Sequence, residues 1–302
     1  MIQKLLVALT VALATLLAPA LARAEVKVVT TVPTLAALAK AIGGSKIKVV
    51  SLSLPTQDPH FVDAKPSLAL ELNQAELLLV VGQGLESGWL PALLTGARNA
   101  DIQVGAHGYL DCSGLVRVLD VSQNADRSQG DVHPDGNPHY LLDPRAAGTV
   151  AEGVARRLGE LDPAEAAFFQ ARLEKFQSRL REARAAVEGR LARLRGVPII
   201  GYHKSWPYLA DWLGVELVDY VEPKPGIPPT PAHVAKLLVT ARKRNVRAIL
   251  QESYYPEESS ALVAEKSGAA LVVLPSGADF EGGQSYFAYL EALTQKLESI
   301  RP

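Results

Sequence analysis

The sequence predicts an α/β protein of two Rossmann-like lobes, each built on a parallel sheet, which one long backbone helix joins. Short β-branched runs alternate with helical patterns along most of the chain, which is typical of parallel βαβ units. A continuous amphipathic helical pattern separates two such sets. With 302 residues, of which 48% are hydrophobic and 21% charged, the chain has globular composition and can bury a sizeable core.

The charge and cysteine content exclude several classes of protein. Lys and Arg total 31 against 32 Asp and Glu, so there is no basic footprint for nucleic acid or an anionic membrane. The single cysteine, Cys112, cannot form an intramolecular disulfide and is expected to be a small buried hydrophobe. Stability must therefore come from a packed core.

Residues 1–24 predict a secretory signal peptide. Lys4 supplies the positive start, an apolar run follows over 5–21, and Ala-Arg-Ala at 22–24 is a small-residue cleavage signal. An uncleaved membrane anchor is the alternative, but the run is marginal for a bilayer span and contains Pro19. Because no cysteine follows the cleavage point directly, a lipid anchor is disfavoured, and the mature chain is expected to be a soluble exported protein.

Residues 25–161 are expected to form the N-terminal α/β lobe. Thr34 is expected to cap a helix that ends at the glycine pair 43–44, and Asp143 followed by Pro144 supplies an N-cap and a first-turn proline for a later helix. The predicted strands of this lobe occupy 26–31, 47–54 and 75–81, with weaker candidates at 102–104 and 116–119.

Residues 162–195 are expected to form the linking backbone helix. Apolar residues recur there at spacings of three, four and seven, opposite Arg, Glu and Gln, so the helix is amphipathic and would be roughly 50 Å long at 1.5 Å per residue. The apolar positions are Phe169, Leu173, Phe176, Leu180, Val187, Leu191 and Leu194.

Residues 196–302 are expected to form the C-terminal α/β lobe, with a proline-rich loop at 222–229. The predicted strands are 197–202, 215–221, 246–252 and 270–274, and the predicted helices are 205–213, 231–243, 257–267 and 285–299.

Three of the six histidines share one kind of position. His60, His139 and His203 each fall just after a predicted strand or just before a helix, at the sheet edge where open α/β folds build their sites. Two belong to the first lobe and one to the second, so a ligand held by all three would lie between the lobes. Three imidazoles with a carboxylate or water make a tetrahedral zinc site. Loop histidines with hydrogen-bonded rings and no metal remain the alternative on position alone.

Four segments carry a family resemblance. DPHFVDAKPS (58–67), GNPHYLLDP (136–144), YHKSWPYLADWLG (202–214) and EPKPGIPP (222–229), in this order around a long helix, resemble the periplasmic metal-binding components of zinc and manganese ABC importers. The resemblance covers most of 26–298. It implies two lobes bridged by a backbone helix, with the metal between them, and it makes His60, His139 and His203 the three leading metal ligands.

The fourth ligand is open at this point. The resemblance implies an Asp or Glu from the loop after a late strand of the second lobe, where Asp279 is the first carboxylate. Glu252, at the end of the preceding strand, is the rival and is otherwise expected to orient a ligating imidazole. Asp279 is the favoured ligand of the two, and water is the third alternative.

The remaining candidates have simpler interpretations. His133, in the polar stretch 122–136, is expected to be a solvated side chain, and His107 and His233 are expected to be structural. The Gly-Gln-Gly segment at 82–84 resembles half of a phosphate-cradling loop but lacks its third glycine and its lysine.

The function predicted from these residues is periplasmic capture of zinc for delivery to an ABC permease, by a monomer that a periplasmic metallochaperone could load. Manganese is less expected because it prefers oxygen donors. An exported zinc hydrolase is a second hypothesis, but the sequence has no H-E-x-x-H motif or nucleophile elbow, so the protein is not expected to be an enzyme. A binder of an organic metal chelate is a third, which would need an Arg-lined or aromatic cleft.

Overall fold

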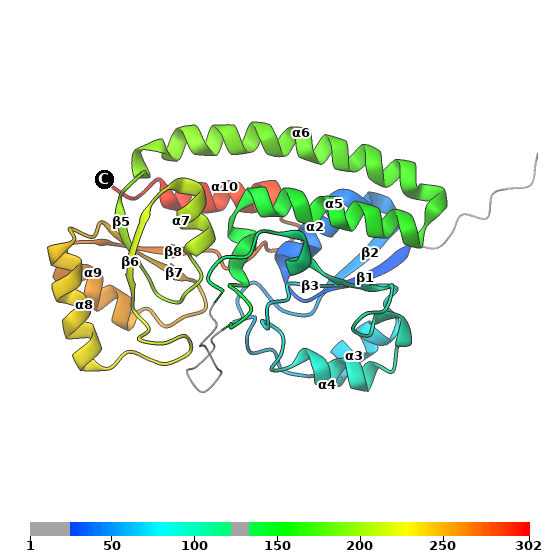
Figure 1. The fold of residues 1–302 in the computed structure, drawn as a ribbon, viewed down its shortest axis with the longest axis horizontal. Helices are drawn as coiled ribbons and strands as arrows, with labels where there is room; N and C mark the ends of the chain where they lie inside the picture. The colour runs from blue at the N-terminus through cyan, green and yellow to red at the C-terminus, as the bar shows by residue number, and fades with distance from the viewer. Residues whose placement is uncertain (1–24, 122–132) are drawn as a thin grey trace, which may run out of the picture.

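Two parallel four-stranded sheets lie side by side beneath one long helix (Figure 1). The computed structural model describes residues 25–121 and 133–302, so the predicted signal peptide and most of the polar stretch 122–136 lie outside the described residues. The predicted α/β fold with two lobes and a bridging helix is confirmed. Within the described ranges, no helix combines the length and the apolar character that a membrane span requires.

The first sheet has the strand order β2-β1-β3-β4, with all neighbours parallel. The weaker strand candidates at 102–104 and 116–119 are wrong, because the edge strand lies between them. The side chain of Asn99 caps a 3-10 turn before this strand, and that of Asp111 caps another directly after it. The strands are β1 (Val26–Thr30), β2 (Ile47–Ser51), β3 (Leu77–Val80) and β4 (Tyr109–Asp111).

Proline opens each helix of this lobe, because its missing N–H costs nothing in the first turn. Asp143 caps α5 as expected, accepting a hydrogen bond from the Arg145 amide. Thr34 is not a cap: its hydroxyl accepts a hydrogen bond from the Ala278 amide of the other lobe. The helices are α2 (Pro33–Gly43), α3 (Pro66–Asn73), α4 (Leu90–Ala97) and α5 (Pro144–Leu161).

The second sheet repeats this order as β6-β5-β7-β8, again with parallel neighbours. Its strands are β5 (Pro198–Gly201), β6 (Glu216–Tyr220), β7 (Ala248–Glu252) and β8 (Ala270–Leu274). Its helices are α7 (Pro207–Leu213), α8 (Pro231–Lys243), α9 (Glu258–Ser267) and α10 (Tyr286–Leu297).

The bridging helix α6 (Ala166–Leu191) has a 3-10 turn at each end, Pro163–Glu165 and Ala192–Leu194, and runs over both lobes (Figure 1). Near its start, the Arg172 guanidinium donates to the Ala41 carbonyl of the first lobe. Near its end, Arg190 pairs with Glu291 and Glu298 of the second lobe at 2.7 and 2.8 Å. The helix is therefore fastened to both lobes.

One hydrophobic core runs through both lobes and α6. It contains Leu79 of β3, Phe176 of α6 and Ile199 of β5, all buried, in a single cluster. Two smaller clusters fill the other faces of the two sheets. The lobes therefore share packed apolar surface, which opposes their separation.

Replacing Phe176 by alanine should destabilise the protein by about 3–5 kcal/mol, the usual cost of emptying a buried phenylalanine site. The ring is 4% exposed and packs 5.1 Å from that of Phe287. Urea unfolding measures the loss, with Arg181→Ala on the exposed face of α6 as the control. A loss below about 1 kcal/mol would contradict the shared core.

Candidate metal centre

Four imidazoles meet between the two sheets. The ring of His60 has its centroid 5.3, 5.4 and 5.1 Å from those of His133, His139 and His203, and His139 lies 5.3 Å from His203. The structure therefore brings the three predicted ligands together and adds a fourth histidine. His133 is the residue that sequence reasoning missed, and the expectation that it is solvated is wrong.

Local hydrogen bonds fix the conformation of the loops that carry His60 and His139. The Asp58 carboxylate accepts from the backbone amide of His60 after β2, and the Asn137 side chain accepts from that of His139 where the turn His139–Leu142 begins. His203 lies two residues after β5, whose last residue, Gly201, is required because a Cβ there would lie 2.3 Å from the Trp206 ring. The loops after two strands and the start of one turn thus bring their imidazoles to one place.

Acceptors fix the orientation of three rings. The Nδ1–H of His60 donates to Asp58 at 2.7 Å, and that of His203 donates to Glu222 at 2.8 Å. His133 donates in the same way to the Gln83 carbonyl at 2.9 Å. Because Nδ1 carries the proton in each, Nε2 keeps the lone pair that a metal needs.

Burial and the neighbouring carboxylates shift the pKa values of the site in opposite directions. Burial, with the neighbouring imidazoles, holds the pKa of His139 well below its usual range. Burial also acts to lower the pKa of His203, but the hydrogen bond and charge of Glu222 outweigh it, so that pKa is raised. Burial would raise the pKa of Asp58, but its contacts with His60 lower it. These carboxylates compensate a bound cation without occupying its coordination positions.

The structure does not bring Asp279 to the imidazoles. Its side chain is exposed, and its carboxylate accepts a hydrogen bond from the Gly282 amide. The two residues before Asp279 contact the other lobe: Gly277 packs on Pro33, and the Ala278 amide donates a hydrogen bond to Thr34. These contacts direct the Asp279 side chain outward. The geometry gives no support to Asp279 as the fourth ligand.

Glu252 lines an interlobe cavity together with His139. It ends β7, is 5% exposed, and neither carboxylate oxygen has a hydrogen-bond partner among the described residues. Burial raises its pKa to about 7. It lines a cavity of about 70 Å³ between the lobes together with His139, Ser205 and Tyr254, which has room for a few waters.

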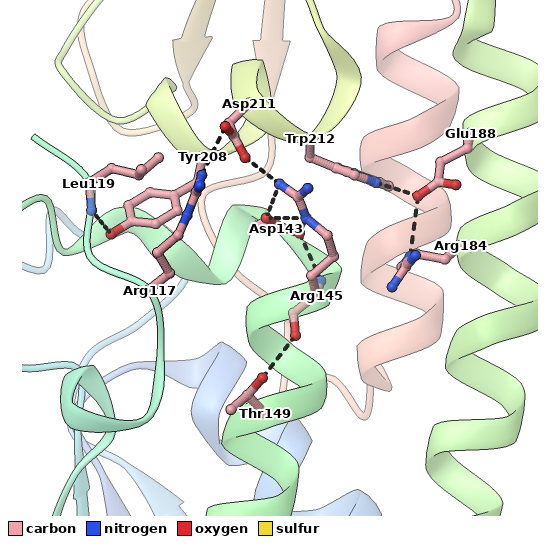
Figure 2. Close-up of polar contacts among 10 residues, drawn as sticks. All are labelled: Arg117, Leu119, Asp143, Arg145, Thr149, Arg184, Glu188, Tyr208, Asp211 and Trp212. Carbon is pink, nitrogen blue, oxygen red and sulfur yellow. Dashed lines mark hydrogen bonds and ion pairs between the residues drawn. The ribbon is translucent and has the colours of Figure 1, made fainter.

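An ion-pair network ties the helix after His203 to the first lobe (Figure 2). The Asp211 carboxylate of α7 lies 2.9 Å from the Arg117 guanidinium and 2.6 Å from that of Arg145. Arg145 also pairs with Asp143, the cap of α5, at 2.7 Å. The network joins the elements that follow His203 and His139, so it fixes the positions of these two histidines relative to each other.

The other singled-out residues lie elsewhere. The His107 ring is exposed and 4.0 Å from Glu160, and His233 donates to the Tyr220 carbonyl at 3.1 Å. Cys112 is buried, as predicted. The Gly-Gln-Gly segment at 82–84 does not lead into a helix that could bind phosphate. It forms the turn whose Gln83 carbonyl accepts a hydrogen bond from His133.

Comparisons with known proteins agree with this architecture. The profile of the family described as zinc-uptake complex component A, periplasmic, matches residues 28–300. A manganese ABC transporter substrate-binding lipoprotein of Streptococcus pneumoniae is 25% identical over 284 residues, which cover 90% of this chain and 88% of the relative. The high-affinity zinc uptake protein ZnuA of Bacillus subtilis is 20% identical, over 83% and 79% of the two chains.

Solved structures show the same fold. A crystal structure of ZnuA superimposes with a TM-score of 0.77 at 24% identity, covering 91% of this chain and 99% of that one. The protein FpvC of Pseudomonas aeruginosa in complex with Ni²⁺ gives 0.74 at 22% identity, covering 91% and 95%.

Replacing Glu252 by glutamine should stabilise the metal-free protein at pH 8 by about 1–3 kcal/mol, since each pKa unit is worth about 1.4 kcal/mol. Its pKa rises from the ordinary 4.5 to about 7, so the folded state holds a proton that the unfolded chain releases in that window. Stability therefore falls as pH rises from 4.5 to 7, and the substitution removes this slope.

Urea unfolding with a chelator at pH 5 and pH 8 measures the difference from the wild type. Glu182→Gln, on an exposed position of α6, is the control. Destabilisation by Glu252→Gln at pH 8 would mean that the carboxylate has a stabilising partner.

Proposed function

Because the chain belongs to the family of periplasmic zinc-uptake complex A components, we propose that it captures zinc in the periplasm and delivers it to the permease of an ABC importer. Proteins of this kind are substrate-binding components of transporters and not enzymes. One observation carries the proposal: imidazoles from both lobes converge with their Nδ1 atoms already hydrogen-bonded outward.

We propose His60, His139 and His203 as ligands of the transported ion. His60 and His203 are 6% and 1% exposed, so an ion there is shielded from water. Zinc forms tetrahedral sites readily with imidazole, whereas the harder Mn²⁺ prefers carboxylate and water. The nitrogen-rich centre supports zinc as the cargo, although the relatives include both a manganese and a zinc protein.

Asp58 and Glu222 act behind the ligands. Each accepts the Nδ1–H of a ligating ring, which fixes the tautomer and makes Nε2 a stronger donor. Glu222 also accepts the Gly226 amide at 3.1 Å, so the proline-rich loop 222–229 holds this carboxylate in place. This gives the loop a positioning role in metal binding.

Asp58→Asn and Glu222→Gln should each weaken zinc binding by roughly 10- to 100-fold, because each removes the hydrogen bond that orients a ligating ring. Replacing His60, His139 or His203 by alanine should weaken it more, because a coordination bond itself is lost. Competition with a zinc-sensitive chelator dye ranks the variants.

His107→Ala, at an exposed histidine, and Asp279→Ala should leave zinc affinity unchanged. If Asp279→Ala weakens binding as much as the histidine variants do, the loop after β8 moves to supply a ligand and the proposed coordination is wrong.

Zinc affinity should fall as pH decreases, because protons compete with the metal for imidazole nitrogen. Glu222 raises the pKa of His203, so this competition should begin above the ordinary imidazole value of about 6.5. Replacing Glu222 by glutamine should move the onset to lower pH. Titrations in two buffers of different ionisation enthalpy measure the protons released, and an affinity that is flat from pH 8 to about 5.5 would exclude imidazole ligation.

A further inference from the structure

The position of His133 relative to His60 is that of two ligands of one metal. Their Nε2 atoms are 3.1 Å apart. In a tetrahedral zinc site with Zn–N bonds of about 2.0–2.1 Å, neighbouring ligand nitrogens are about 3.3–3.4 Å apart. One ligand atom from each of His60, His133 and His139 also falls within a mutual 4.8 Å. The Nε2 atoms of His60 and His133 need to move apart only by tenths of an ångström to share an ion.

The hydrogen bonds leave the facing nitrogens as acceptors. A carbonyl oxygen can only accept, so the bond to Gln83 requires the proton of neutral His133 to be on Nδ1. Asp58 sets the same tautomer in His60. Two neutral rings then point lone pairs at each other across 3.1 Å, and that arrangement is favourable only with a proton or a cation between them.

The turn that supplies the Gln83 carbonyl is strained. Gln83 has a φ of 52°, a left-handed conformation that costs a non-glycine residue about 1 kcal/mol. Gly82 and Gly84 beside it have φ values of 82° and 77°, and a Cβ on Gly82 would lie 2.1 Å from the Asp111 carboxylate. The structure holds this backbone in a costly shape, and the shape orients the His133 ring.

The chain on the carboxyl side of His133 is fastened beside His203. The Tyr208 hydroxyl accepts from the Leu119 amide at 2.9 Å, as Figure 2 shows, and donates to the Asn137 carbonyl at 3.0 Å. The Asn137 side chain donates to the carbonyl of Lys204, the residue after His203, at 2.7 Å. The amide of Gly136 closes a tight turn on the His133 carbonyl at 3.2 Å. These contacts join both lobes at the base of the His133 turn.

We propose that His133 is the fourth ligand, so that the transported ion is held by four imidazole nitrogens and no carboxylate. The inference rests on the proposed function. It departs from the site that the family resemblance implies, and it gives the centre its specificity: an all-nitrogen shell accepts Zn²⁺, Co²⁺ and Ni²⁺ and rejects Mn²⁺. Four protein ligands also leave no position for a metal-bound water.

The test compares His133→Ala with His107→Ala in the full chain, using Zn²⁺ and Co²⁺ as probes. His133→Ala should lower zinc affinity by more than ~10-fold and should change the Co²⁺ absorption in position and intensity, since water replaces an imidazole. Added free imidazole should restore the wild-type Co²⁺ spectrum, which a merely structural defect would not allow. The preference for Zn²⁺ over Mn²⁺ should fall, and His107→Ala should match the wild type throughout.

Zinc affinity within about two-fold of the wild type together with an unchanged Co²⁺ spectrum in His133→Ala would overturn the inference. If His60→Ala and His203→Ala still lose zinc in that case, only the fourth ligand is wrong and the proposed function stands. If the wild-type protein binds none of these ions, the proposed function and the inference fail together.

Discussion

The proposed metal centre depends on a fixed spacing between the two lobes, because His60 and His139 come from one lobe and His203 from the other. Metal–ligand distances tolerate deviations of only about 0.2 Å, so a loose hinge would leave the rings unable to share an ion. The continuous core beneath α6 sets the spacing, and polar contacts such as that of Thr34 with the Ala278 amide hold it near the site. A frame held by core packing reduces the ordering cost of binding.

Within that frame, burial and the placement of the carboxylates have different effects on the imidazoles. Desolvation disfavours protonated imidazole, as the lowered pKa of His139 shows, and this keeps a nitrogen available to the metal. Asp58 and Glu222 supply negative charge, but each contacts the Nδ1 side of a ring and leaves the Nε2 side open. A dication therefore meets neutral nitrogen donors directly and carboxylates one ring away. This arrangement favours ions that bind nitrogen over those that need oxygen.

The parallel strands, the bridging helix and three of the imidazoles are predictable from the sequence because their signals are local. A strand that runs into a histidine-bearing loop places that histidine at the sheet edge, as at His60 and His203. The placement of Asp279 and of His133 is not predictable from local pattern because it depends on contacts made across the fold. Asp279 turns outward where the chain packs on the other lobe, and His133 turns inward to meet a carbonyl 50 residues earlier in the chain.

A carrier must also let its ion leave, and the four rings are not equally buried: His60 and His203 are buried, whereas His133 and His139 are half-buried. Carboxylates hold His60 and His203, and His139 begins a turn that runs into α5. The His133 ring, which donates to the Gln83 carbonyl, is half-buried on an open groove of about 370 Å³ that His60 and Trp89 also line. The proposed fourth ligand thus lies on the open, groove side of the site. Tight binding and release are compatible in such a site, because losing one ring on the groove side opens the shell while the other three keep their geometry.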